Sequence, residues 1–122
     1  MRVTDDAGAL KGWRPLGGSI KFGERAEDTL KREFQEELGQ AITEPRLLCV
    51  LENLYEHAGH RGHEIVFVYE AAFVDHGAYA TDRFTFVDGG PVHAEWIERS
   101  AFDGEALLFP EGLATRLRGR PA

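Results

Sequence analysis

The segment GGSIKFGERAEDTLKREFQEELGQ, residues 17–40, carries the clearest helical pattern in the chain. Apolar side chains recur there at every fourth position: Ala26, Leu30, Phe34 and Leu38. This spacing places them on one stripe and predicts a helix over residues 26–38, which must bury that stripe against another element. Gly39 follows the last apolar residue, where a left-handed helix cap is favoured.

Three glutamates crowd one side of this predicted helix. Glu33, Glu36 and Glu37 span an arc of roughly 100° next to the apolar stripe. Like charges at this spacing destabilise a helix, so something should compensate for their repulsion. Solvent is the ordinary explanation for a bare acidic run. A bound divalent cation is the functional one, because Mg²⁺ prefers oxygen ligands.

Composition narrows the class of protein. The chain has 122 residues, 43% of them hydrophobic, which predicts a single globular domain over residues 1–122. Its formal net charge of −7 argues against a protein that binds polynucleotide backbone. Its single cysteine, Cys49, lies in an apolar run and is expected to be buried. We find no signal peptide and no apolar run long enough to span a membrane, so we expect a cytoplasmic protein.

The remaining pattern alternates strands and helices. Nearly continuous apolar runs at 46–56 and 63–74 predict two strands, with a loop at 57–63 between them. Residues 75–93 look loop-rich. A short strand at 94–98 precedes a last helix that we expect to begin at Pro110. This order predicts an α/β sandwich, a mixed sheet with helices packed on it.

The glutamates stand in a wider pattern. Gly18 is followed by five residues and Glu24, and seven further residues lead to Arg32, Glu33, Phe34, Gln35, Glu36, Glu37, Leu38 and Gly39. This arrangement resembles the signature of the Nudix hydrolase family. Seven of these positions are fixed in the signature, and they would occur together by chance on the order of once in 10⁹ windows. The seven are Gly18, Glu24, Arg32, Glu33, Glu36, Glu37 and Gly39. Gln40 departs from the signature, which usually has an apolar residue there, and Ala41 or Ile42 is expected to take that place.

The resemblance implies a Nudix-like α/β/α sandwich and the hydrolysis of a pyrophosphate bond. The substrate would be a nucleoside diphosphate linked to another moiety. The implied cofactor is Mg²⁺, for which Mn²⁺ could substitute, and the implied partner is a small nucleotide, with no polynucleotide and no membrane.

The resemblance also implies roles for individual residues. Arg32, Glu33, Glu36 and Glu37 are the expected catalytic residues. The expected metal ligands are Gly18, Glu33, Glu36 and Glu37. Gly17, Gly18 and Trp13 are expected to contact substrate, and Glu24 to hold the preceding loop to the helix. The general base would be Glu36, Glu37 or a loop residue outside the signature: Glu64, Asp82, Asp88 or Glu95.

Other residues give weaker signals. His57, His60 and His63 could form a zinc site, although solvent-exposed loop residues are the simpler interpretation. Trp13, Trp96 and Phe109 could stack on a base, but large aromatic side chains in a small domain are usually core.

The start of the sequence suggests that the protein forms a homodimer. Only 17 residues precede Gly18, and Asp5–Gly12 is poor strand material. Because an unpaired sheet edge invites another chain, we expect a homodimer in which the partner covers this region or donates Met1–Leu10. The alternative to an enzyme is a nucleotide-binding or interaction module that keeps the scaffold without turnover.

Overall fold

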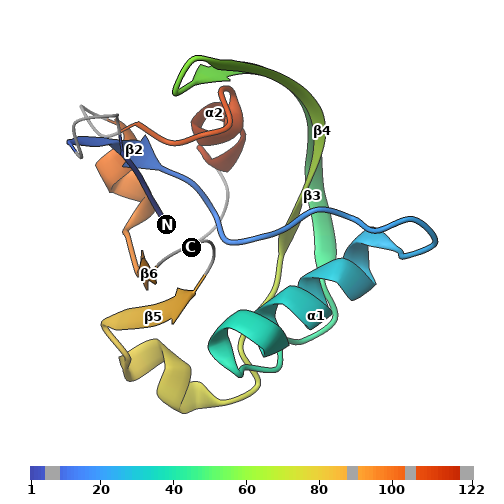
Figure 1. Ribbon diagram of the computed structural model, residues 1–122. Helices are drawn as coiled ribbons and strands as arrows, with labels where there is room; N and C mark the ends of the chain where they lie inside the picture. Colours follow the sequence, from blue (N-terminus) through green and yellow to red (C-terminus); the bar gives the residue numbers. More distant parts are fainter. Residues whose placement is uncertain (5–8, 88–90, 104–106, 119–122) are drawn as a thin grey trace. The chain divides into compact units, whose positions relative to one another are not determined.

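The computed structural model describes residues 1–4, 9–87, 91–103 and 107–118 (Figure 1). The chain forms two compact units. The first comprises Met1–Pro15, Cys49–Val68 and Ile97–Ala122, and the second comprises Leu16–Leu48 and Tyr69–Trp96. Each unit is described by itself, and the single domain expected from the sequence stays a prediction.

The second unit is organised around helix α1, Ala26–Leu38, which has the predicted bounds. The helix packs against strand β5, Arg83–Val87, which pairs antiparallel with β6, Pro91–Glu95. The apolar stripe of α1 thereby reaches a core, as its spacing requires.

Gly39 ends α1 in the left-handed conformation, with φ 65°. Its N–H donates to the carbonyl of Gln35 at 3.0 Å, and the N–H of Gln40 donates to the carbonyl of Phe34 at 3.3 Å. Half-buried Ile42 forms a bridge with Phe73, whereas Ala41 is exposed. Ile42 thus takes the apolar place that Gln40 leaves open.

An aromatic cluster includes Phe34 of α1. Phe73 lies at its centre, with ring centroids 5.8–6.0 Å from those of Phe34, Tyr79, Phe84 and Trp96. Tyr79 belongs to the short 3-10 helix η1, His76–Ala80. Trp96 stacks on Tyr79 at 5.2 Å and donates its Nε1–H to the carbonyl of Ala78, although 49% of Trp96 is exposed.

The first unit contains a hairpin at the start of the chain. Strand β1, Arg2–Thr4, pairs antiparallel with β2, Leu10–Trp13. The expectation that residues up to Gly12 are poor strand material was therefore wrong for Leu10–Gly12. Gly12 is buried where a Cβ would meet Phe109 and the carbonyl of Leu107, so close packing explains a glycine in this strand.

Strands β3, Arg46–His57, and β4, His60–Glu70, form a long hairpin. The loop predicted at 57–63 was wrong, because the turn is only Ala58 and Gly59, both with positive φ. Such a two-residue turn matches the twist of the strands. The second strand also ends at Glu70, earlier than the predicted residue 74.

The last segments differ from the prediction as well. The region 75–93, expected to be loop, contains η1 and β5, and the predicted strand at 94–98 is β6, Pro91–Glu95. A 3-10 helix, η2, spans Arg99–Asp103, and helix α2 spans Leu113–Leu117, so Pro110 does not begin it. Leu113 is 1% exposed, and Cys49 is buried as predicted.

The strands confirm an α/β protein but not one mixed sheet. The described strands pair as three two-stranded antiparallel sheets. The layered sandwich stays a prediction. In the described part of the chain, none of the helices has the length and apolar character needed to cross a membrane, and the compartment also stays a prediction.

Candidate functional site

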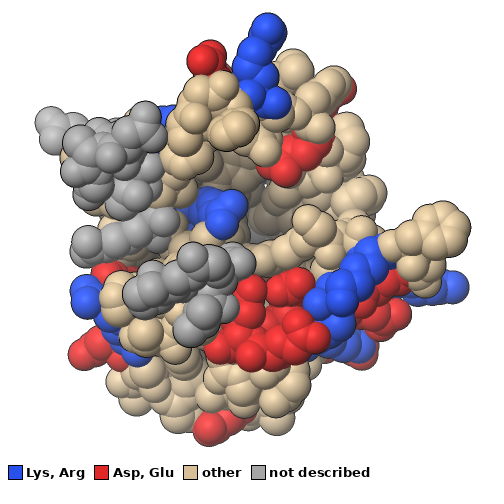
Figure 2. Space-filling view, in the orientation of Figure 1, with Lys and Arg blue, Asp and Glu red and all other residues tan. Residues whose placement is uncertain are grey.

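The candidate site is built on the exposed side of α1. Figure 2 shows acidic side chains gathered over this helix, with basic side chains beside them. Glu33 lies low on the surface with 16% of its side chain exposed, whereas Glu36 stands out with 58% exposed. Glu37 is half-buried on the same helix. The glutamates therefore share a surface but differ in solvation.

Arg32 lies between the carboxylates and relieves their repulsion. Its Nη1 donates to Oε1 of Glu33 at 3.1 Å and to Oε2 of Glu36 at 3.2 Å. Charge-assisted hydrogen bonds of this kind offset the cost of neighbouring like charges. The positive charge that compensates for the neighbouring glutamates is thus supplied by a side chain of the protein itself, Arg32.

Glu24 holds the other edge of the same guanidinium. Its Oε2 accepts from Nε of Arg32 at 2.7 Å and its Oε1 accepts from Nη2 at 3.0 Å. This two-point geometry fixes the plane of the guanidinium. The hydrogen bonds from Arg32 and then Thr29 lower the pKa of Glu24 to about 2. Glu24 therefore joins the preceding loop to α1, as expected.

The loop comes close to the helix at Gly18. A Cβ on Gly18 would overlap the carboxylate of Glu33, whereas a Cβ on Gly17 would meet nothing within 4 Å. The chain thus needs glycine at position 18 for its backbone to lie against Glu33. Gly18 and Glu33 are thus brought together, and their role as metal ligands stays a prediction.

The chemistry of these groups fits a hard divalent cation. Carboxylate and carbonyl oxygens of Gly18, Glu33, Glu36 and Glu37 are the donors that such cations prefer. In the described ranges, however, no three His, Cys, Asp or Glu side chains already converge as a metal site. Arg32 engages Glu33 and Glu36 instead, so a cation would need these carboxylates to turn.

The candidate bases outside the signature lie elsewhere. Glu64 accepts from Asn53 at 3.0 Å in the β3–β4 hairpin of the first unit. Glu95 is paired with Arg83 at 2.8 Å, and Asp82 is exposed just before β5. Asp88 lies outside the described residues. The role of each of these side chains as general base stays a prediction.

The weaker sequence signals have ordinary surroundings. His57, His60 and His63 are exposed on β3 and β4, and His63 contacts Glu52 at 2.8 Å. No zinc-binding group involving them occurs among the residues described. Phe109 contacts Gly12 and Lys11 within the first unit. Trp13 also belongs to the first unit, so its role toward substrate stays a prediction.

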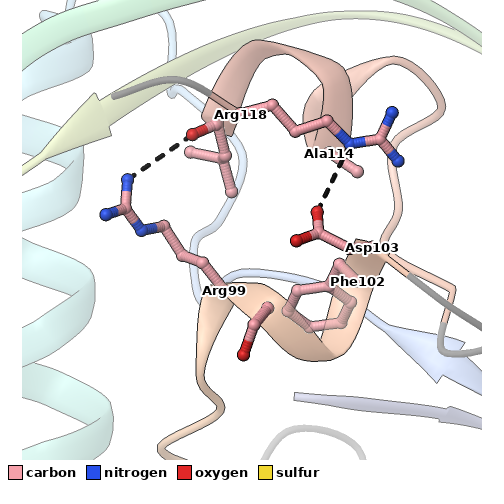
Figure 3. A pocket seen from close by; sticks show the side chains of 7 residues that line it. Arg99, Phe102, Asp103, Ala114 and Arg118 are labelled. Atoms are coloured by element: carbon pink, nitrogen blue, oxygen red, sulfur yellow. Dashed lines mark hydrogen bonds and ion pairs between the residues drawn. The ribbon is translucent and has the colours of Figure 1, made fainter. Parts of the chain in front are cut away.

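A pocket of about 460 Å³ lies between η2 and α2 in the first unit. Figure 3 shows Arg99, Phe102, Asp103 and Arg118 around it. Arg118 pairs with Asp103 at 3.4 Å, and Arg99 donates to the carbonyl of Leu117 at 3.4 Å. These arginines are thus engaged by the pocket's own wall, and the pocket offers no carboxylate cluster like that on α1.

One polar residue at the site was missed by sequence reasoning. Thr29 lies three residues before Arg32 and four before Glu33, so it shares their face of α1. Its hydroxyl contacts Glu24 at 2.8 Å. The helical spacing of Thr29 could be read from the sequence, but its contact with Glu24 could not, because Glu24 precedes the helix.

Comparison with known proteins agrees with this geometry. Residues 3–113 match the NUDIX domain family. The match covers most of the chain, and the chain belongs to this family, which confirms the resemblance in its sequence. Members of the family generally depend on a divalent metal.

Individual relatives match a shorter segment. The chain is 43% identical over 42 residues to the nucleoside triphosphatase NudI of Escherichia coli (strain SE11), and 45% identical over 42 residues to that of Escherichia fergusonii. The same protein of Shigella flexneri is 43% identical over 42 residues. Each match covers 34% of this chain and 30% of the relative. No solved structure matches the chain significantly.

Proposed function

We propose that this protein is a Nudix-type pyrophosphohydrolase that cleaves a pyrophosphate bond in a nucleoside diphosphate linked to another moiety. The observation that carries the proposal is the acidic face of α1, where Arg32 holds Glu33 and Glu36 and Gly18 lies against Glu33. Family membership and relatives named nucleoside triphosphatase support nucleotide chemistry.

The cofactor we propose is Mg²⁺, with Mn²⁺ as a substitute. Glu33, Glu36, Glu37 and Gly18 would hold it, because together they supply several oxygen donors. When bound, such a cation neutralises phosphate charge and lowers the pKa of water. The role of Arg32 is to hold the carboxylates of Glu33 and Glu36 close together.

The chain supplies the remaining groups of the reaction. A carboxylate must take the proton of the attacking water, and Glu36 and Glu37 are the candidates nearest to the site. The backbone at Gly17 and Gly18 has no side chains to keep phosphates away, which suits close contact with substrate. Trp13 remains a candidate to contact the base.

A substrate screen tests the proposal. Nucleoside triphosphates, sugar nucleotides, ADP-ribose and dinucleoside polyphosphates would be incubated with and without Mg²⁺, beside the Glu36→Gln variant. We expect cleavage of the pyrophosphate bond in at least one class, detected as a nucleoside monophosphate product, only with metal and only from the unaltered chain. Tight nucleotide binding without turnover would instead establish the alternative, a binding module on this scaffold.

For the homodimer expected from the sequence, we also propose the β3–β4 hairpin as the interface in place of the region around Met1–Leu10, because β1 and β2 already pair within the chain. The contact of Glu52 with His63 shows that these residues share one face, so their alternate neighbours share it too. Apolar side chains on that face are 43–70% exposed: Val50, Leu54, Ile65 and Phe67. An apolar surface of this kind favours a partner.

The charges on the hairpin face favour a second copy as that partner. Acidic Glu52 and Glu56 lie on β3, whereas basic Arg61 and His63 lie on β4. A two-fold axis places each β3 against the β4 of the other copy, which pairs opposite charges around an apolar centre.

A further inference from the structure

Thr29 is a polar residue in an apolar position. It lies in the second turn of α1 and is 2% exposed, which makes it the one buried polar side chain in the part of the chain that the structure describes. Buried hydroxyl groups are costly unless they are hydrogen-bonded. A threonine is also a weaker helix former than alanine. Its hydroxyl should therefore have a use.

The hydroxyl has two acceptors and one proton. Oγ1 of Thr29 lies 2.8 Å from Oε1 of Glu24 and 3.1 Å from the carbonyl oxygen of Arg25. The carboxylate is the nearer acceptor and the charged one, so it makes the stronger hydrogen bond. The proton of Thr29 thus serves Glu24.

Thr29 differs from the other groups that hold Glu24. The N–H of Lys21 donates to Glu24 at 3.2 Å, but it belongs to the same loop and moves with it. Arg32 lies on α1, but its guanidinium also contacts Glu33 and Glu36. Thr29 is on the helix and contacts none of the cluster carboxylates. It can therefore keep Glu24 in place while Arg32 is disturbed.

Such a disturbance is part of the proposed function, on which this inference rests for its catalytic consequence. A cation held by Glu33 and Glu36 would compete with Nη1 of Arg32 for these two carboxylates. Arg32 would then be held mainly by Glu24, which it contacts through Nε at 2.7 Å and through Nη2 at 3.0 Å. If Glu24 shifted as well, Arg32 would be left without a fixed position beside the cluster.

We propose that Thr29 is a positioning residue, whose hydroxyl fixes Glu24 on α1 so that Glu24 fixes Arg32 beside the acidic cluster. The four side chains Thr29, Arg32, Glu33 and Glu36 follow the spacing of one helical face, and Glu24 joins that face from the loop. Removing such an outer hydrogen bond typically costs about 10–100-fold in metal affinity or activity.

The test replaces the hydroxyl without changing the shape of the side chain. Thr29→Val removes only the hydrogen bond, and Thr29→Ser keeps it. Thr115→Val, at an exposed position on α2, is the control. We expect Thr29→Val to lower kcat about tenfold, with KM changed less, and to weaken Mn²⁺ binding by a similar factor. Thr29→Ser and Thr115→Val should stay within about twofold of the unaltered chain. Loss in both Thr29 variants would show that the methyl packing matters instead.

A double variant shows whether Thr29 acts through Glu24. If it does, Thr29→Val should add little to Glu24→Ala in either kcat or Mn²⁺ affinity, because Glu24→Ala already removes the acceptor of the Thr29 hydroxyl. Full additivity of the two losses would contradict the inference.

A third measurement needs neither metal nor substrate. The carboxylate ¹³C shift of Glu24 should change in Thr29→Val and return in Thr29→Ser. An unchanged shift in Thr29→Val would overturn the inference whether or not the protein turns over nucleotides. Turnover in the unaltered chain with unchanged kinetics in Thr29→Val would overturn it while leaving the proposed function intact.

Discussion

Arg32 determines how the carboxylates of α1 coexist. Three of its nitrogens contact three glutamates at 2.7–3.2 Å, so one cation compensates for a cluster that would otherwise repel. The arginine is also the group with which a metal ion would compete for Glu33 and Glu36. Its pairing with Glu24 raises its pKa, so Arg32 stays charged at every pH of interest.

Neutralising single glutamates separates metal binding from helix stability. We expect Glu36→Gln and Glu37→Gln to weaken Mg²⁺ or Mn²⁺ binding and to lower activity by several orders of magnitude. The free energy of unfolding should change little, because the relief of like-charge repulsion is offset in Glu36→Gln by the loss of its exposed ion pair with Arg32. Metal titration and thermal unfolding measure the two effects. Glu27→Gln, on the exposed first turn of α1, is the matched control, and equal metal binding in all variants would place the site elsewhere.

Glu24 predicts how stability responds to acid. Its pKa falls from 4.5 to about 2 on folding, so the unfolded chain binds more protons between these values. Stability from this group is then complete above pH 4.5 and declines as the pH falls toward 2. Urea unfolding between pH 4.5 and pH 2 should show that the free energy of unfolding falls more steeply with pH in the unaltered chain than in Glu24→Gln. Parallel slopes would contradict the hydrogen bonds described for Glu24.

The residues of the site were largely predictable because their spacing is a helical property. Glu33, Glu36 and Arg32 share a face by geometry alone. Thr29 was missed because its role depends on Glu24 folding back from a loop, and no local periodicity encodes that return.

At the scale of elements, α1 was predictable because its start, stripe and cap all agree. The β3–β4 turn was not, since glycine at 59 and 62 suggested one long loop. Gly62 is in β4, where a Cβ would overlap the ring of Tyr55, so packing rather than a turn explains that glycine. Pro110 suggested a helix start, but α2 begins three residues later, at Leu113.

The loop before α1 makes its own prediction. Gly18→Ala should weaken metal binding and activity, because the added methyl overlaps the carboxylate of Glu33 and forces the loop away from the helix. Gly17→Ala adds the same atom where nothing lies within 4 Å, so its metal affinity should change little. Isothermal titration with Mn²⁺ compares the two, and an equal response would show that the contact with Glu33 is unimportant.

At the scale of the whole molecule, the sequence predicted an α/β protein but not how its strands pair. Apolar runs identify buried strands without naming their partners, and three two-stranded sheets have the same local patterns as one larger sheet. The exposed hairpin face is a consequence of that pairing and could not be derived from periodicity.

The hairpin face tests the homodimer. Light scattering at micromolar concentration should give twice the chain mass of 13.6 kDa. Ile65→Lys should return the protein to a monomer, because a charge is introduced into the apolar centre of the face. Thr115→Lys adds the same charge on α2 and should leave the dimer intact. A folded monomer in the unaltered chain would refute this interface.

We expect hydrolysis by attack of water at phosphorus. The proposed metal ligands and bases on α1 are carboxylates, and the described contacts of Arg32 with Glu33 and Glu36 involve no serine or cysteine nucleophile. Turnover of the best substrate from the screen in ¹⁸O-labelled water, with Mg²⁺ present, would be followed by mass spectrometry of both products. The account predicts label in a phosphate product. Label only in a sugar or other organic product would contradict it.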